Sequence, residues 1–150
     1  MIRRATPGDL DALIGMGHKF FAASGYADIA RFDDASFRAT LDQLMAANAV
    51  CLVAEIDGQV VGAAGALAYP FYFDASHKTG QEVFWWLDPE HRGGQTGIQL
   101  FAGLEAWARG QGCRTFTMIA LDAVDAARVG RIYQRCGYRA SEHSYIKELK

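Results

Sequence analysis

The chain has 150 residues, of which 51% are hydrophobic and 21% are charged. This balance is typical of one soluble globular domain and excludes extended disorder or a second full domain. Fifteen lysines and arginines against seventeen aspartates and glutamates leave a net charge of −2, so no overall positive field would attract nucleic acid or an anionic membrane. We therefore expect residues 1–150 to form a single domain that binds anions only through local geometry.

The sequence also predicts a cytoplasmic protein. The basic N-terminus is followed by Gly8 and Asp9 rather than by an apolar segment, unlike a signal peptide. The longest uncharged stretch, residues 60–73, is interrupted by glycines and a proline, is shorter than the roughly 20 residues a membrane helix needs, and predicts strand and loop. Three cysteines without CxxC spacing predict reduced thiols packed as small hydrophobes: Cys51, Cys113 and Cys136.

The first predicted elements are a strand over residues 2–5 and a helix over residues 9–21. A Thr-Pro-Gly-Asp segment supplies the helix start, with its threonine or aspartate as the cap. A second helix is predicted over residues 34–47, because apolar residues recur there at three and four positions, and Asn48 is its expected stop.

Strands are predicted next. Residues 50–56 and 59–67 flank an Asp-Gly pair, which is the strongest short signal for an antiparallel hairpin. Residues 82–87 are rich in Val, Phe and Trp and predict a further strand, which the following Asp-Pro pair ends. A glycine-rich turn follows this strand.

A helix from Thr96 or Gly97 to residue 109 is apolar around more than one face, so we expect it to be largely buried. Residues 114–121 predict a central strand. A last helix, capped by Asp122 or Asp125, should run to residue 136 and end at a left-handed glycine.

Tyr138 and residues 144–149 suggest two closing strands. This order of elements predicts an α/β fold of the mixed-sheet (α+β) type, with one right-handed crossover around the glycine turn.

The glycine-rich turn carries the strongest functional signal. Without side chains at Gly93, Gly94 and Gly97, backbone amides can approach an anion closely where the helix dipole adds positive charge. The turn predicts a diphosphate cradle that is neither a Walker loop nor a GxGxxG fingerprint. Arg92 beside it favours anion binding over a plain surface charge.

At this point the sequence resembles the GNAT superfamily of N-acyltransferases, whose motif runs Arg/Gln-x-x-Gly-x-Gly/Ala. Arg92 and Gly97 match its ends, whereas Gln95 stands at the middle glycine. Residues 132–138 are similar to the family's later Leu-Tyr-x-x-x-Gly-Phe segment, and the element order fits nearly the whole chain. The resemblance implies a mostly antiparallel sheet splayed at one parallel pair, with helices on both faces.

The resemblance also implies direct transfer of an acetyl group from acetyl coenzyme A to a primary amine. The backbone of Trp85 and Leu87 would hold the pantetheine and thioester, and an amide there would stabilise the oxyanion. Tyr133 would protonate the departing thiolate, although its helical spacing alone favours a core tyrosine. The turn residues expected to bind the cofactor are Arg92, Gly93, Gly94, Gln95, Thr96 and Gly97.

Glu82 is the candidate for the base that removes a proton from the attacking amine. Side chains alternate along a strand, so Glu82 is out of phase with Trp85 and Leu87 unless a β-bulge intervenes. Asp88 and His91 remain alternatives, as does a water relay, and a solvated carboxylate is the plain structural interpretation of Glu82. The histidines lack metal-ligand spacing, so no metal is expected.

The acceptor is less defined by the sequence. An aromatic wall, or equally a core cluster, could be formed by Phe20, Phe21, Tyr26, Tyr69, Phe71, Tyr72 and Phe73. We favour a small-molecule or amino-acid-like amine over nucleic acid.

Two other functions are weighed against the enzyme. The first alternative is a non-catalytic acyl-CoA-binding sensor, supported by Gln95 and by Ala126 at the place of a family asparagine. A structural domain that pairs through its last strands ranks third, and a homodimer is compatible with all of these interpretations.

Overall fold

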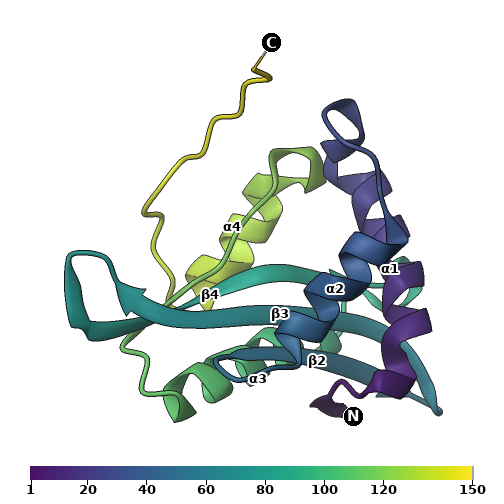
Figure 1. Ribbon diagram of the computed structural model, residues 1–150, viewed down its shortest axis with the longest axis horizontal. Helices are drawn as coiled ribbons and strands as arrows, with labels where there is room; N and C mark the ends of the chain where they lie inside the picture. The colour runs from purple at the N-terminus through teal and green to yellow at the C-terminus, as the bar shows by residue number, and fades with distance from the viewer. Residues whose placement is uncertain (150) are drawn as a thin grey trace.

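The computed structural model describes residues 1–149 and contains one five-stranded sheet in the order β1-β2-β3-β4-β5 (Figure 1). The strands are β1 (Ile2–Arg4), β2 (Ala49–Ile56), β3 (Gln59–Phe71), β4 (Asp74–Leu87) and β5 (Thr115–Thr117). All neighbouring strands are antiparallel except β4 and β5, which are parallel. The predicted mixed sheet with one parallel pair is confirmed.

Helices cover both faces of this sheet, as predicted (Figure 1). The helices are α1 (Leu10–Ser24), α2 (Asp34–Leu44), α3 (Thr96–Gly110) and α4 (Ala126–Arg135). α1 and α2 pack on one face and α3 packs on the other, within the crossover from β4 to β5. None of the helices within residues 1–149 combines the length and the apolar character that crossing a bilayer would require.

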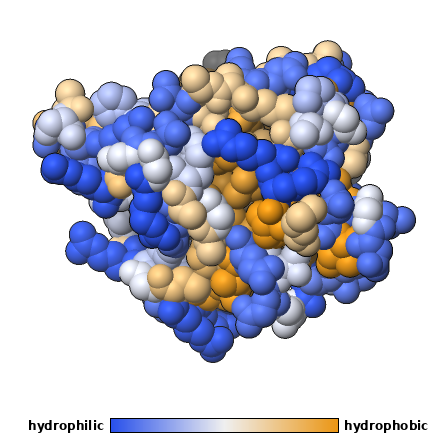
Figure 2. Space-filling view, turned by 90° about the horizontal axis from the view of Figure 1, so that it is seen from below, coloured by the Kyte–Doolittle hydropathy of each residue, from blue (hydrophilic) through white to orange (hydrophobic). Residues whose placement is uncertain are grey.

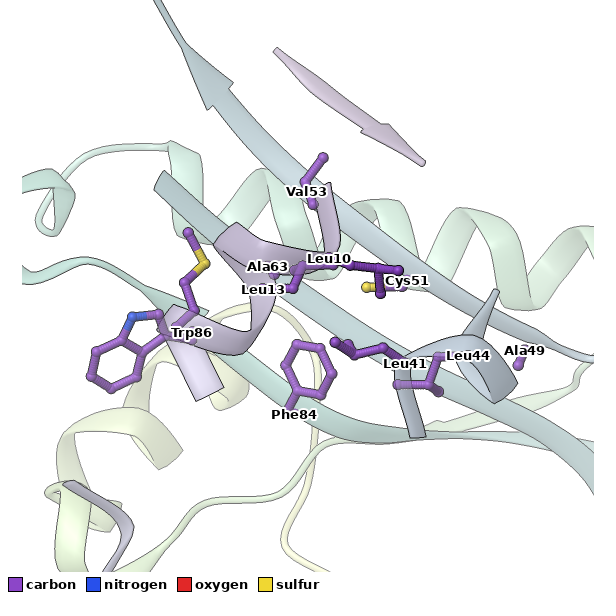
Figure 3. Packing of buried hydrophobic residues seen from close by; sticks show 11 residues of the cluster. Leu10, Leu13, Leu41, Leu44, Ala49, Cys51, Val53, Ala63, Phe84 and Trp86 are labelled. Carbon is purple, nitrogen blue, oxygen red and sulfur yellow. The ribbon is translucent and has the colours of Figure 1, made fainter. Parts of the chain in front are cut away.

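The larger core lies between the sheet and helices α1 and α2. Leu13 and Leu41 pack there with Ala63, Phe84 and Trp86, as the close view shows (Figure 3). A second cluster, under α3, contains Leu87, Leu100 and Leu104 among others. Burial of these side chains provides the main stabilisation that holds β4 between the two helical layers.

The β2–β3 hairpin forms where the Asp-Gly pair predicted it. Ile56 pairs with Gln59, and Asp57 and Gly58 between them have φ values of 51° and 78°. Two successive positive φ values are what a type I′ turn requires, and its twist matches that of the flanking strands.

β3 and β4 form a longer hairpin than the sequence predicts. The prediction placed β3 at residues 59–67 and β4 at 82–87, whereas the ladder continues through the Pro70–Lys78 pair. This end of the hairpin projects from the body of the protein (Figure 1). Both of its faces meet solvent, so the extension lacks the apolar alternation by which a half-buried strand is identified.

A β-bulge interrupts β4 at Val83. Gly65 pairs with Phe84 while the next residue, Ala66, pairs with Glu82, which leaves Val83 as the extra residue. A bulge shifts the alternation of side chains by one position. Residues before and after Val83 that would otherwise share a face therefore lie on opposite faces of the sheet.

The C-terminal third departs most from the prediction. The strand expected to be central over residues 114–121 is the three-residue β5, which pairs only with β4 among the described strands. The closing strands expected at Tyr138 and residues 144–149 are not formed within the described chain, and that segment extends away from the sheet (Figure 1). The side chains of residues 144–149 are exposed, so they gain no core contacts that would fix a strand.

Smaller differences concern helix ends and cysteines. α1 continues to Ser24 and stops at Gly25, whose φ of 79° is a left-handed cap. α2 ends at Leu44, before the predicted residue 47. Cys51 is buried as expected, but Cys136 is exposed because it lies past the last turn of α4, so it is not a core residue.

The surface mixes apolar and charged side chains. The face seen from below, where α3 lies in Figure 1, carries apolar patches among hydrophilic side chains (Figure 2). Such interspersed apolar surface is ordinary for a folded chain and by itself identifies no site.

Candidate active site

A cleft of about 1060 Å³ opens beside the C-terminal half of β4. It is lined by the end of β4, the glycine turn and the start of α3, by residues 119–135, which include α4, and by Phe20 and Tyr26. Most of the predicted site residues lie here: Glu82, Trp85, Leu87, Arg92, Gly93, Gly94, Gly97 and Tyr133. Gln95 and Thr96 lie in the same turn but outside this lining.

The cleft forms where β4 and β5 separate. Their ladder ends at Gln81. On the opposite edge of β4, the amide of Asp88 donates to Val61 O at 2.9 Å. Successive residues of a strand direct their N–H and C=O groups to opposite neighbours. The main-chain groups of Trp85 and Leu87 therefore face the gap, as the predicted splay requires.

The glycine turn is shaped to receive an anion. Gly93 has a φ of 91°, and an added Cβ at Gly93 or Gly94 would meet no atom within 4 Å. α3 begins at Thr96, has no acidic residue in its first turn, and receives no side-chain cap from Gln95. Its first N–H groups thus keep the partial positive charge that stabilises a phosphate.

Arg92 links the turn to the end of β4. Its Nε donates to Leu87 O at 2.7 Å, and its guanidinium carbon lies 4.5 Å from the centre of the Trp86 ring. Nε is the one side-chain nitrogen of Arg92 that has a hydrogen-bond partner within residues 1–149. Arg92 therefore positions the turn, and its terminal nitrogens keep donors for a ligand.

Gly97 has a packing role that the sequence did not predict. A Cβ at this position would lie 3.2 Å from the Trp85 ring. The Trp85 indole Nε1 also donates to Gly97 O at 3.0 Å. The close approach of strand and helix thus favours glycine here even before a ligand binds.

Glu82 lies on the cleft side of β4 because of the Val83 bulge. An added Cβ at Gly80 would touch Phe116 beside α3, whereas Phe84 packs in the core under α1 and α2. Without the bulge, residues 80, 82 and 84 would share one face. The bulge instead places Glu82 with Trp85, the condition under which the sequence allowed it as a base.

The carboxyl of Glu82 is almost completely buried, with 5% of its surface exposed. Burial disfavours the charged form and raises the pKa of Glu82 to about 7, although a hydrogen bond from the Ile119 amide acts in the opposite direction. That bond is 2.8 Å long. A carboxyl with a pKa near neutrality can accept and release a proton at working pH.

Tyr133 projects from α4 into the same region. Its hydroxyl donates to Ile119 O at 2.9 Å, and its ring lies 5.9 Å from that of Trp85. Burial, and then the nearby charge of Glu82, raise the pKa of Tyr133 above its ordinary value. The phenol therefore stays protonated and is a hydrogen-bond donor at neutral pH.

The alternative bases are placed differently. Asp88 is buried and accepts Lys19 Nζ at 2.9 Å and Trp86 Nε1 at 3.0 Å. Although burial acts to raise the pKa of Asp88, these partners bring it below its usual value. Asp88 thus ties α1 to the end of β4 rather than serving as a free base. His91 lies in the short turn after β4 and does not line the cleft.

The predicted aromatic wall is divided. Phe20 and Tyr26 line the cleft, whereas Phe21 packs against Phe32 with ring centres 5.7 Å apart. The aromatic residues at the end of the β3–β4 hairpin lie outside the cleft lining: Tyr69, Phe71, Tyr72 and Phe73.

Sequence reasoning missed two features of the site. Ile119 was treated as part of a strand, and its main chain is instead the shared partner of Glu82 and Tyr133. Arg128, Arg131 and Arg135 line the cleft from α4. Their spacing of three and four residues in the sequence could have predicted that they share one face of a helix.

Comparison with known proteins gives one family and several similar structures. A family model described as the acetyltransferase (GNAT) family matches residues 19–138. An aminoglycoside N(6')-acetyltransferase type 1 of Stenotrophomonas maltophilia is 27% identical over 144 residues, which cover 94% of this chain and 87% of that protein.

Two solved structures illustrate the likeness of fold. A transcriptional regulator from Bacillus halodurans C-125 superposes with a TM-score of 0.80 at 19% identity and covers 99% of both chains. AAC(6')-Iy, in complex with the bisubstrate analogue CoA-S-monomethyl-acetylneamine, gives a TM-score of 0.79 at 20% identity, covering 100% of this chain and 97% of its own. At such identities the likeness concerns the fold alone.

Proposed function

The chain belongs to the acetyltransferase (GNAT) family, whose members are acetyl coenzyme A-dependent N-acetyltransferases, and from this we propose that it acetylates a primary amine by direct attack on the thioester. One observation carries the proposal: the glycine turn and the buried carboxyl of Glu82 line the same cleft. The main-chain groups of Trp85 and the amide of Leu87, which lie past the end of the β4–β5 ladder, are on the part of the lining between them in the chain. An anion site, a hydrogen-bonding strand edge and a base are the parts this transfer needs.

The residues of the turn fit the diphosphate of coenzyme A. Open space around Gly94 leaves room for phosphate oxygens at the uncapped start of α3. When bound, acetyl coenzyme A supplies the activated acetyl group. The cofactor-binding set that we propose is Trp85, Leu87, Arg92, Gly93, Gly94, Gln95, Thr96 and Gly97.

Two side chains would handle the protons. Glu82 takes one proton from the acceptor ammonium, which frees the lone pair that forms the new carbon–nitrogen bond. As the carbon–sulfur bond breaks, Tyr133 donates its proton to the sulfur and recovers one from the acetylated nitrogen through solvent. The near-neutral pKa of Glu82 and the protonated state of Tyr133 support these roles.

The acceptor that we propose is a small molecule with a primary amine. Phe20 and Tyr26 at the cleft offer apolar faces against which the body of such a molecule can pack. The similarity to an aminoglycoside acetyltransferase supports an amine on a small molecule rather than on nucleic acid. An amino-acid-like amine belongs to the same class.

Release of free thiol from acetyl coenzyme A across an amine panel tests this function. The panel contains amino acids, simple alkyl amines, an aminoglycoside and a peptide with a free N-terminus. We expect turnover with at least one small amine. Turnover with the peptide alone would contradict the acceptor class, and no turnover with any amine would contradict the enzyme.

A non-catalytic acyl-CoA sensor is the second candidate. Gln95 and Ala126, which depart from the family pattern, favour it. A calorimetric titration with coenzyme A, run beside the thiol assay, separates the two functions. Binding without turnover selects the sensor, and binding with turnover selects the enzyme.

The homodimer stays a prediction, and the C-terminal segment is the surface that supports it. Tyr145 and Leu149 are 97% and 92% exposed, although their spacing suggested a strand. A second copy is a partner that could cover this segment in a symmetric pair. Light scattering on the full chain and on a variant lacking residues 141–150 tests it, with a dimer expected only for the full chain.

A further inference from the structure

Three arginines on α4 line the cleft and have no carboxylate partner within residues 1–149. Arg128, Arg131 and Arg135 are spaced by three and four residues, so they lie along one helical face about 10 Å long. Among residues 1–149 none of the three takes part in a salt bridge. Arg3 and Arg109, by contrast, are each paired with acidic side chains.

The charge of the cleft differs in sign from that of the whole chain. The chain has a net charge of −2, yet four arginines line the cleft against two carboxyl groups. One of these carboxyls, Asp125, is occupied as the cap of α4, where it accepts the Arg128 amide at 3.1 Å. The other, Glu82, is buried and faces Ile119. The α4 arginines are therefore local, uncompensated positive charge.

These arginines and the glycine turn line the same cleft. If the turn takes the diphosphate of coenzyme A, as the proposed function has it, one phosphate of that molecule is left without a partner. It is the 3′-phosphate, a dianionic monoester on the ribose next to the diphosphate. Guanidinium groups bind phosphate oxygens through paired, charge-assisted hydrogen bonds.

We propose that Arg128, Arg131 and Arg135 bind the 3′-phosphate of coenzyme A and so make the protein selective for coenzyme A over 3′-dephospho-coenzyme A. The inference rests on the proposed use of coenzyme A but not on catalysis. A plain solvated face is the competing explanation. It predicts no difference between the two ligands.

Isothermal titration with coenzyme A and with 3′-dephospho-coenzyme A, without acceptor, tests the proposal. We expect the wild type to bind coenzyme A about tenfold or more tightly than the dephospho form. In a triple variant, Arg128→Gln, Arg131→Gln and Arg135→Gln, this ratio should fall toward one, with the affinity for the dephospho form little changed. All three side chains are exposed, so the variant should keep its fold, and circular dichroism confirms that.

Arg139→Gln is the matched control, because it removes the same charge just beyond α4 and does not line the cleft. It should keep the wild-type ratio. Equal affinities of the wild type for the two ligands would overturn the inference and leave the proposed function standing. A ratio preserved in the triple variant would also overturn it, and would leave the three arginines as a solvated face of α4. Failure of both ligands to bind would overturn the proposed function together with the inference.

Discussion

Glu82 and Tyr133 hold the same residue from its two ends: the carboxylate accepts the Ile119 amide at 2.8 Å, and the phenol donates to the Ile119 carbonyl at 2.9 Å. Residues 118–121, which leave the sheet after β5, are thereby anchored beside β4. The two side chains proposed for proton transfer thus also fix one wall of the cleft. Each variant below is therefore assessed for stability as well as for activity.

Glu82→Gln should lower kcat/KM by about 10²-fold or more, the loss typical of a removed general base. The pKa of Glu82 lies at about 7, so wild-type kcat/KM should rise as pH increases toward 7 and level off above it. The glutamine amide can still accept the Ile119 N–H, so the wall should stay in place. Steady-state kinetics from pH 5.5 to 8.5 check this, with the exposed Glu90→Gln as control. A glutamine variant that keeps both rate and pH profile would assign the base elsewhere.

The raised pKa of Glu82 also predicts that the stability of the fold depends on pH. Its pKa is raised from 4.5 to about 7 by folding, so the folded chain binds the proton more tightly than the unfolded chain. The contribution of Glu82 to stability is fully present below pH 4.5 and is lost as pH rises through 7. The lost amount is about 3 kcal/mol at most. Urea unfolding of wild type and Glu82→Gln at pH 5 and pH 8 measures it: the variant should gain relative stability at pH 8, and an unchanged difference would contradict the raised pKa.

Gly94→Ala separates ligand binding from folding at the glycine turn. An added Cβ at Gly94 meets nothing within 4 Å, and its φ lies outside the left-handed region. The melting temperature should therefore stay near that of the wild type, while the methyl group enters the space proposed for phosphate oxygens and weakens coenzyme A binding about tenfold. Gly97→Ala should instead destabilise the fold, because its Cβ would press on Trp85. Thermal melting and titration decide, and unchanged affinity in Gly94→Ala would place the diphosphate elsewhere.

The Asp-Gly hairpin and the glycine turn were predictable because each depends on local backbone geometry. Asp57 and Gly58 need positive φ values that few other residue pairs adopt, and Gly93 does so before α3. The face of β4 on which Glu82 lies was not predictable, because residues 83–87 are all apolar and a one-residue shift in their alternation is not visible in the sequence. The bulge is seen only in the pairing of β3 with β4, where Gly65 pairs with Phe84 and Ala66 pairs with Glu82.

The prediction of C-terminal strands was wrong for a different reason. Residues 144–149 have β-forming side chains, but a strand exists only where an edge is offered to it. β5 is three residues long and presents little edge, so Tyr145 and Ile146 remain exposed. Sequence propensity shows that a segment can form a strand, whereas a neighbouring strand edge determines whether it does so.

Gly130 in α4 shows no structural need for glycine. Close passage of a ligand or tight packing on a strand would require a glycine inside a helix, but a Cβ here would meet nothing within 4 Å and Gly130 does not line the cleft. Gly130→Ala should therefore stabilise the protein by about 1 kcal/mol through higher helix propensity, with coenzyme A affinity unchanged. Denaturant unfolding and titration test both parts. Weaker coenzyme A binding in this variant would bring the ligand closer to α4 than the cleft lining implies.

Tyr133→Phe distinguishes a general acid from a core tyrosine, because it removes one oxygen and keeps the ring. If Tyr133 donates the proton to the departing thiolate, Tyr133→Phe should lower kcat by about 10²-fold. The lost bond to Ile119 O should also cost about 1 kcal/mol of stability. Its raised pKa makes the phenol a weaker acid than free tyrosine. In this structure the hydroxyl donates to the Ile119 carbonyl, so it must turn toward the sulfur to act.

Tyr138→Phe is the matched control for this change. Its hydroxyl donates to Glu105 Oε1 at 2.8 Å, its ring centre lies 5.8 Å from that of Tyr133, and it does not line the cleft. Both variants should lose similar stability, but only Tyr133→Phe should lose turnover per folded molecule. Kinetics and melting on the same preparations, with the acceptor found in the amine panel, provide the comparison. Equal turnover in the two variants would leave Tyr133 with the structural role alone and assign protonation of the thiolate to water.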